Sequence, residues 1–129
     1  MKKFLLFMFL VFVAACDNKE IALYEENSQE VNQAMVGEKM VIKLEANPTT
    51  GYKWHFEVAN ENNNLLKVLL EDYKPHPHKR GMVGVGGTAI YKFQALKKGR
   101  AIVIAKYYRP WEEFDPENDK EVRFFIDIR

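Results

Sequence analysis

Cysteine is almost absent from this chain: the 129 residues include a single one, Cys16. One cysteine excludes a disulfide within the chain, and the residues after position 16 contain no thiol for nucleophilic catalysis or metal binding. The stability of the folded domain must therefore come from its apolar core. Roughly 110 residues suffice for one domain, because a chain of that size buries somewhat under 70% of its unfolded surface.

An excess of either charge is also absent, since 19 Lys and Arg stand against 18 Asp and Glu. No basic stripe is present to meet phosphates, which argues against a nucleic-acid partner. Histidine is scarce as well, because His76 and His78 form the one close pair and His55 stands apart. A zinc site needs three or four ligands, so we expect no metal and no cofactor.

Long hydrophobic runs are limited to Phe4–Val13, which is much shorter than the roughly 20 residues that cross a bilayer as a helix. Lys2 and Lys3 precede this run, and the small residues Val13-Ala14-Ala15 end it. This order is typical of an export signal, and we expect residues 1–15 to be removed as a signal peptide.

Cys16 directly follows this segment, and the arrangement resembles the signal of bacterial lipoproteins, in which the cysteine is acylated and becomes the mature N-terminus. Acyl chains would anchor the protein to a membrane, because each buried CH₂ contributes about 0.8 kcal/mol. We expect an exported lipoprotein, periplasmic or on the cell surface; the alternative is a secreted protein with an ordinary signal. Residues 16–35 read as a polar tether, within which Ile21, Leu23 and Val31 could start an edge strand.

A sustained helical pattern is missing, whereas apolar residues recur at every second position from Glu38 onward. Such alternation covers residues 40–46, 53–58, 88–96, 101–107 and 122–128. Residues 65–73 are apolar without a clear period and fit either a strand or a helical turn. Ile102 and Ile104 make their segment apolar on both faces, as in a central strand. The pattern predicts an all-β domain over residues 36–129, an antiparallel β-sandwich, with a barrel as the alternative.

The connection after the segment 40–46 has more polar residues than a simple turn needs. It consists of Asn47, Pro48, Thr49, Thr50, Gly51 and Tyr52. Pro48 fixes φ, Asn47 can bond its own backbone two residues on, and Gly51 permits positive φ. These roles leave the adjacent threonines unexplained. We expect Thr49 and Thr50 to stiffen the tip and to present their hydroxyls outward.

A second connection is rich in glycine and yet apolar. After Gly81 it consists of Met82, Val83, Gly84, Val85, Gly86, Gly87 and Thr88. Glycines let another chain approach the backbone closely. A phosphate-binding loop would lead into a helix, but these glycines lead into a strand, and a flexible linker would be polar. The exposed apolar side chains favour a loop that enters a partner's pocket.

A third connection begins with Tyr107-Tyr108-Arg109-Pro110-Trp111. Aromatic residues and arginine are typical of binding hot spots, and Pro110 lowers the entropy lost on docking. The alternative is a core tryptophan that covers the end of the sandwich, but the acidic residues after Trp111 favour a place at the rim. In a Greek-key sandwich the three connections can gather at one end.

Together, "NPTTGY", "GVGGT" and "RPW", in this order on a β-rich domain, resemble the motifs of the chagasin-type inhibitors of papain-family cysteine proteases. The resemblance covers residues 36–129 and implies an immunoglobulin-like sandwich with no disulfide, whose three loops form a wedge in the protease cleft. It implies that Pro48–Gly51 sits over the catalytic cysteine and that Met82–Thr88 lies along the unprimed subsites. It also implies that Arg109 and Trp111 contact the primed side.

We therefore expect a reversible, non-covalent and tight-binding inhibitor of papain-like cysteine proteases, monomeric and without enzymatic activity. A glycoside-hydrolysing enzyme is disfavoured, because Glu112, Glu113 and Asp115 read as an exposed charged loop rather than a catalytic carboxylate pair. The remaining alternative is a surface-anchored β-sandwich module that binds a receptor, a glycan or another surface protein.

Overall fold

The structure is a computed structural model that describes residues 20–59, 64–77, 79–82 and 84–129. The signal predicted at residues 1–15 and the acylation site predicted at Cys16 lie outside these residues. The elements, in chain order, are β1 (Ile21–Leu23), the 3₁₀ helix η1 (Glu25–Gln29), β2 (Val31–Ala34), β3 (Lys39–Ala46), the 3₁₀ helix η2 (Pro48–Thr50), β4 (Lys53–Ala59), β5 (Leu66–Pro75), β6 (Gly87–Ala95), β7 (Gly99–Tyr108) and β8 (Lys120–Ile128).

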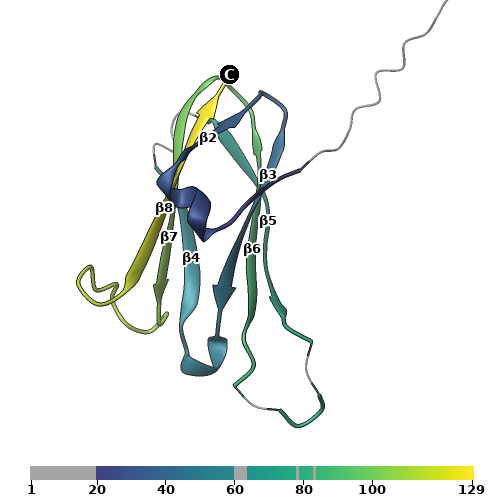
Figure 1. Cartoon of the computed structure of the whole chain (residues 1–129). Helices are drawn as coiled ribbons and strands as arrows, with labels where there is room; N and C mark the ends of the chain where they lie inside the picture. The colour runs from purple at the N-terminus through teal and green to yellow at the C-terminus, as the bar shows by residue number, and fades with distance from the viewer. Residues whose placement is uncertain (1–19, 60–63, 78, 83) are drawn as a thin grey trace, which may run out of the picture.

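The strands form two four-stranded sheets that pack face to face (Figure 1). The first sheet has the order β1-β3-β6-β5 and the second the order β2-β8-β7-β4. Strands β3, β6 and β5 pair antiparallel in the first sheet, as do β8, β7 and β4 in the second. The edge strands β1 and β2 instead run parallel to β3 and β8.

The predicted all-β sandwich is confirmed, but its sheets are not antiparallel throughout. The parallel pairs involve β1 and β2, which come from the polar segment 16–35. The chain leaves the first sheet after β1, passes through η1 to the second sheet, and returns to β3 after the turn at 35–38. Because no hairpin joins either strand to its partner, each can pair in the parallel direction. The segment 65–73, left open between strand and helical turn, forms β5.

The core lies between the sheets and follows the period of two. Along β6 every second residue is buried, and β8 shows the same alternation. The largest fully buried side chains are Tyr91, Phe93, Phe124, Met40, Ile42, Leu44, Ile126 and Val103. Burying a side chain of this size stabilises the fold by about 1.5–3 kcal/mol. This core holds the strand ends, and thus the loops between them, on a rigid base.

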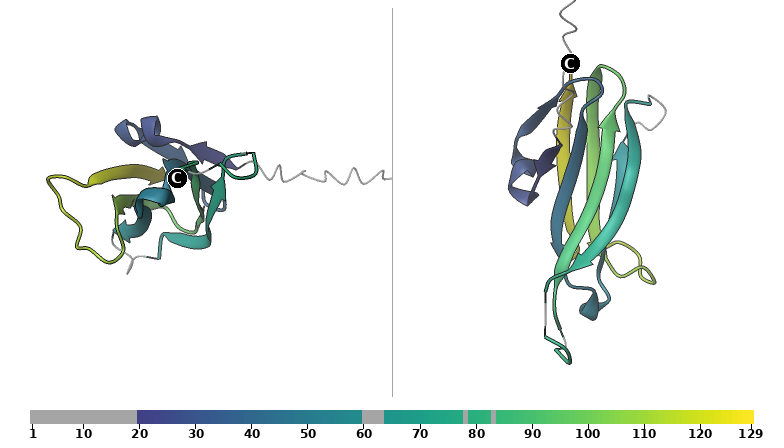
Figure 2. Two further views of the ribbon diagram at one scale, coloured as in Figure 1. Left: turned by 90° about the horizontal axis from the view of Figure 1, so that it is seen from below. Right: turned by 90° about the vertical axis from the view of Figure 1, so that its right-hand side faces the viewer.

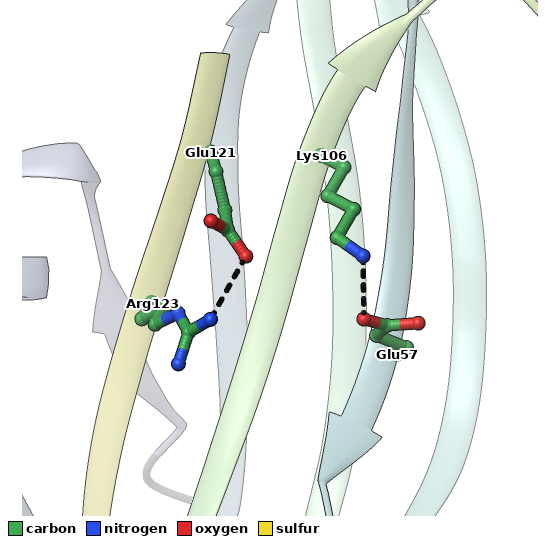
Figure 3. A network of polar contacts seen from close by, with 4 residues as sticks. All are labelled: Glu57, Lys106, Glu121 and Arg123. Atoms are coloured by element: carbon green, nitrogen blue, oxygen red, sulfur yellow. Dashed lines mark hydrogen bonds and ion pairs between the residues drawn. The ribbon is translucent and has the colours of Figure 1, made fainter. Parts of the chain in front are cut away.

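The outer face of the second sheet is charged (Figure 3). Lys106 Nζ lies 3.1 Å from Glu57 Oε1 across β7 and β4, and Arg123 Nη2 lies 3.3 Å from Glu121 Oε1 along β8. Exposed pairs of this kind contribute at most about 1 kcal/mol each. Their main effect is to keep this face hydrated. Ile104 of the central strand β7 is half-buried on the sheet.

The connections of the sandwich divide between its two ends (Figures 1 and 2). The β3–β4, β5–β6 and β7–β8 connections lie at one end, which we call the loop end. The turns at 35–38 and 96–98 lie at the other, which we call the distal end. No helix within the described ranges has the length and apolarity needed to cross a membrane.

Candidate functional site

The first loop at the loop end is a tight 3₁₀ turn that Asn47 caps. Asn47 Oδ1 accepts a hydrogen bond from the backbone N–H of Thr49 at 3.2 Å. Pro48 occupies the first position of the turn, and Gly51 ends it with φ of +83°. The predicted roles of these three residues are confirmed, because proline suits the first position and glycine the left-handed end.

The two threonines complete this turn from within. The Thr49 hydroxyl donates to Asn47 Oδ1 at 2.5 Å, and the Thr50 hydroxyl donates to the Asn47 carbonyl at 2.8 Å. The expectation that these hydroxyls point outward is therefore wrong. Short hydroxyl side chains readily bond to nearby backbone groups, as Thr50 does here, whereas Thr49 bonds the side-chain oxygen of Asn47. The expectation that the threonines stiffen the tip agrees with these bonds.

Arg109 of the third loop binds the first loop directly. Its Nε donates to the Thr50 carbonyl at 3.1 Å, and its guanidinium carbon lies 4.8 Å from the ring centre of Tyr52. Glu112 completes the surroundings of the guanidinium, with Oε1 3.6 Å from Nη1. Arg109 thus holds the turn in place at Thr50, and it remains accessible at the surface of the loop end.

Trp111 is exposed at the same place, and its exposed fraction of 71% excludes the alternative of a core tryptophan. Its ring nevertheless lies against the first loop: a Cβ added at Gly51 would fall 2.5 Å from Trp111 Cη2. Gly51 is therefore needed for two reasons, since its φ is positive and its Cα faces the indole. The indole thus projects from the loop end while one edge of its ring packs against Gly51.

Three aromatic rings, those of Tyr52, Trp54 and Tyr107, pack together at the base of the first loop. The backbone N–H of Asn47 donates to the Tyr107 hydroxyl at 2.9 Å. The Tyr107 ring lies 5.3 Å from that of Tyr52 and stacks on Trp54 at 4.8 Å. Tyr107 begins the third predicted loop, but the contacts predicted for that loop are those of Arg109 and Trp111 alone. Its hydroxyl is the feature that marks it, because a half-buried tyrosine hydroxyl usually finds a polar partner.

The glycine-rich second loop meets the first loop at one point. Asn47 Nδ2 donates to the Gly84 carbonyl at 3.4 Å, and the backbone N–H of His76 closes the loop on the Gly86 carbonyl at 3.0 Å. Gly84 has φ of +75°, which glycine adopts without strain. Met82 is exposed, as predicted. Val83 lies outside the described residues.

The last two residues of the predicted second loop belong to strand β6. Gly87 is buried and pairs with both Ala46 and Pro75, so it lies between two strands. Thr88 follows it in the strand. The projecting part of the second loop therefore ends at Gly86, and Gly87 and Thr88 form its base.

The acidic part of the third loop is a turn built around Asp115. The pKa of Asp115 lies below its ordinary value, because the Asn118 side-chain amide donates to Oδ2 at 2.6 Å and the Glu117 backbone N–H donates to Oδ1 at 3.0 Å. A pKa lowered by folding stabilises the folded state above the ordinary carboxyl pKa, and this stability is lost as the pH falls through the folded pKa. The turn should thus keep its shape in mildly acidic solution.

An open apolar hollow of about 600 Å³ lies between the edge strands β4 and β5 and reaches the loop end. Its lining includes Tyr52, Trp54 and Phe56 from the first loop and β4, Tyr73 from β5, and Trp111 at the loop end. The apolar surface at the loop end thus extends onto the side of the sandwich. Among the described residues, no group of three or more His, Cys, Asp or Glu side chains is placed to hold a metal ion.

The structure therefore brings the three predicted loops together at one end, tied by bonds from Asn47 and Arg109. A comparison with protein families matches residues 33–128 to the family described as "Chagasin family peptidase inhibitor I42". Chagasin of Trypanosoma cruzi is 32% identical over 94 residues, covering 73% of this chain and 83% of that protein. Amoebiasin-2 of Entamoeba histolytica is 28% identical over 108 residues, covering 81% of this chain and 85% of that protein. Among solved structures, a cysteine protease inhibitor from Entamoeba histolytica superposes with a TM-score of 0.71 at 25% identity, covering 85% of this chain and 96% of the other.

Proposed function

The chain belongs to the chagasin family of peptidase inhibitors, and on this premise we propose that it blocks papain-like cysteine proteases by filling their active-site cleft with its three loops. The inhibition is reversible and non-covalent, and one monomer acts on one protease. The chain supplies no catalytic group of its own. The site consists of the first loop, the second loop up to its base, and the start of the third loop.

The observation that carries the proposal is the convergence of the three loops into one connected surface. Asn47 joins the first loop to the second, and Arg109 joins it to the third. Loops that are held in place before binding lose less conformational entropy on association, which favours tight binding. A β-sandwich whose connections diverged would present separate contacts and gain no such advantage.

The first loop can lie over a catalytic thiol without being cut. Proteases cleave extended backbone with a free carbonyl, whereas this tip is a 3₁₀ turn. Three of its carbonyls already accept hydrogen bonds: that of Asn47 from the Thr50 N–H, that of Pro48 from the Gly51 N–H, and that of Thr50 from Arg109. Attack on such a carbonyl requires the turn to open, so the inhibitor survives contact with the nucleophile.

The other two loops supply the contacts on either side of the thiol. The second loop has little side-chain bulk and an exposed methionine, so its backbone can approach the walls of a groove that binds extended chain. The third loop presents the indole of Trp111, the kind of large rigid side chain that anchors interfaces. Thr49 and Thr50 then occupy the centre.

A titration of the purified protein into papain and related cysteine proteases, with trypsin as the serine-protease control, tests the function. We expect peptide turnover by the papain-like enzymes to fall at near equimolar inhibitor and to return on dilution, while trypsin is unaffected. The inhibitor should remain one intact band after prolonged incubation. Undiminished turnover at micromolar inhibitor would favour the surface-binding module instead.

We also propose that the chain is exported and acylated at Cys16, which places the inhibitor on a membrane. In a bacterial expression host, the parent chain should incorporate labelled fatty acid and sediment with membranes. Cys16→Ala should abolish the label and move the protein to the soluble fraction, because no acyl chain remains to partition into lipid. Equal labelling of the two chains, or a soluble parent, would show that the segment is an ordinary secretory signal.

A further inference from the structure

We propose that the distal end of the sandwich docks on an anionic phospholipid bilayer, with the three loops directed away from it. The surface, which we call the basic pole, consists of Met35, Val36, Leu96, Lys97, Lys98, Arg100 and Arg129. The orientation of the domain on the membrane rests on the acylation proposed for Cys16. The affinity of the basic pole for lipid does not depend on that acylation. Residues 60–63 lie outside the described residues and are no part of it.

The apolar part of the basic pole is unusually exposed. Met35, Val36 and Leu96 are 66%, 47% and 40% exposed, although the core residues beside them, Ala34 and Ala95, are buried. These three side chains lie in the two turns of the distal end, where nothing in the described structure covers them. Apolar side chains among cations at the tip of a domain suit the boundary between lipid headgroups and acyl chains.

The charged part of the basic pole is cationic. Lys97, Lys98 and Arg100 are exposed, and none of the ion pairs within the described residues involves them. Of the nearby carboxylates among the described residues, Asp127 pairs with Arg129, and Glu38 accepts from the Met35 backbone N–H at 2.8 Å but keeps its negative charge. An anionic membrane surface complements this charge, and each lysine near such a surface strengthens binding several-fold.

Backbone hydrogen bonds hold the basic pole together as one rigid surface. Gly37 N–H donates to the Ala95 carbonyl at 2.8 Å, which joins the two turns. Val36 N–H donates to the Arg129 carbonyl at 3.1 Å, which joins the first turn to the end of β8. The residues of the pole, although distant in sequence, therefore face a partner together at the end opposite the three loops (Figure 2).

The direction of strand β1 points to the same side. Strand β1 runs parallel to β3, from the distal end toward the loop end, so its first residue, Ile21, lies at the end of the strand nearer the basic pole. Residues 17–20 separate Cys16 from β1, and a chain of that length reaches at most about 17 Å. A lipid on Cys16 thus keeps the pole near the bilayer, while strands the length of β7 hold the loops about 30 Å away.

Binding to vesicles tests this surface without the lipid anchor. The probe is the processed protein carrying Cys16→Ala, mixed with vesicles of phosphatidylcholine alone or of equal parts phosphatidylcholine and phosphatidylglycerol. We expect binding to the anionic vesicles only, weakened by salt. Lys97→Glu with Lys98→Glu should lower the partition coefficient at least about 30-fold, because each lysine contributes about 1 kcal/mol near such a surface and the new carboxylates are repelled by it.

Lys53→Glu with Lys74→Glu is the matched control, since both residues are exposed and lie toward the loop end. It should reduce lipid binding far less than the change at the pole. Inhibition of papain by the Lys97/Lys98 variant should equal that of the parent, which separates this proposal from the proposed function. Equal binding to both vesicle types, equal losses in the two variants, or a dimer in light scattering that the Lys97/Lys98 change dissolves would overturn the proposal.

Discussion

Replacing Trp111 with alanine is expected to raise the inhibition constant against a papain-like protease about 100-fold, or about 2.8 kcal/mol of binding free energy. The indole is 71% exposed at the loop end and makes no core contact. Its removal should therefore change the free energy of unfolding by no more than about 0.5 kcal/mol. Most of the loss should appear as faster dissociation, because interface changes act mainly on that rate.

Dissociation rates on an immobilised, thiol-blocked protease and urea unfolding would measure these two quantities separately. Phe125→Ala is the matched control, since it also truncates a partly exposed aromatic ring but on the outer face of β8. That variant should lose some stability and keep its inhibition constant. An unchanged dissociation rate for Trp111→Ala across several papain-like enzymes would remove Trp111 from the binding surface.

Gly51→Ala should raise the inhibition constant roughly 30-fold, about 2 kcal/mol, although it adds one methyl group. The new Cβ would lie 2.5 Å from Trp111 Cη2 and 3.2 Å from Cζ2, so the exposed indole must leave its seat. Because the ring can swing into solvent, the clash itself costs little stability. The remaining cost is that of an alanine at φ of +83°, about 1–2 kcal/mol.

Gly37→Ala separates backbone strain from displacement of the indole. Gly37 has φ of +93°, lies at the distal end, and has nothing within 4 Å of an added Cβ. Its alanine variant should lose a similar free energy of unfolding and inhibit like the parent. If Gly37→Ala weakened inhibition as much as Gly51→Ala does, general destabilisation would explain both.

The double variant of Gly51 and Trp111 gives a sharper measurement. If Gly51→Ala acts by displacing the indole, then adding it to Trp111→Ala should have little further effect on the inhibition constant. Residues in contact show such non-additivity, whereas independent sites add within about 0.5 kcal/mol. Additive losses in binding free energy would mean that Gly51 affects protease binding through the conformation of the turn and not through the position of the indole.

The core and the long strands followed from the sequence because their pattern is local. Tyr91 and Phe93 recur at the period of a strand, and both are buried as that period requires. The gathering of the three loops at one end could also be anticipated, since strand direction decides at which end a connection lies. These inferences need only the alternation and the order of the strands.

Pairings that depend on distant partners could not be read in the same way. Strand β1 has three residues, too few to show a period, and its parallel partner is chosen by the path through η1. The hydroxyls of Thr49 and Thr50 have several acceptors within reach, and the sequence does not rank them. The bond from Arg109 to Thr50 joins residues 59 positions apart. A guanidinium fork can bind its own chain or a partner equally well.

Strand β1 has a mechanical consequence for the arrangement proposed above, in which a lipid anchor holds one end of the domain and a protease binds the other. Its register pairs Ile21 with Met40 and Leu23 with Ile42, along the long axis of the sandwich. A pull on the chain before Ile21 acts along that axis, so it shears these hydrogen bonds simultaneously rather than peeling them one by one. Because Leu23 is buried in the core, sliding β1 along β3 would also have to pull this side chain out of its packing. Tension across the domain is thereby resisted at its entry point.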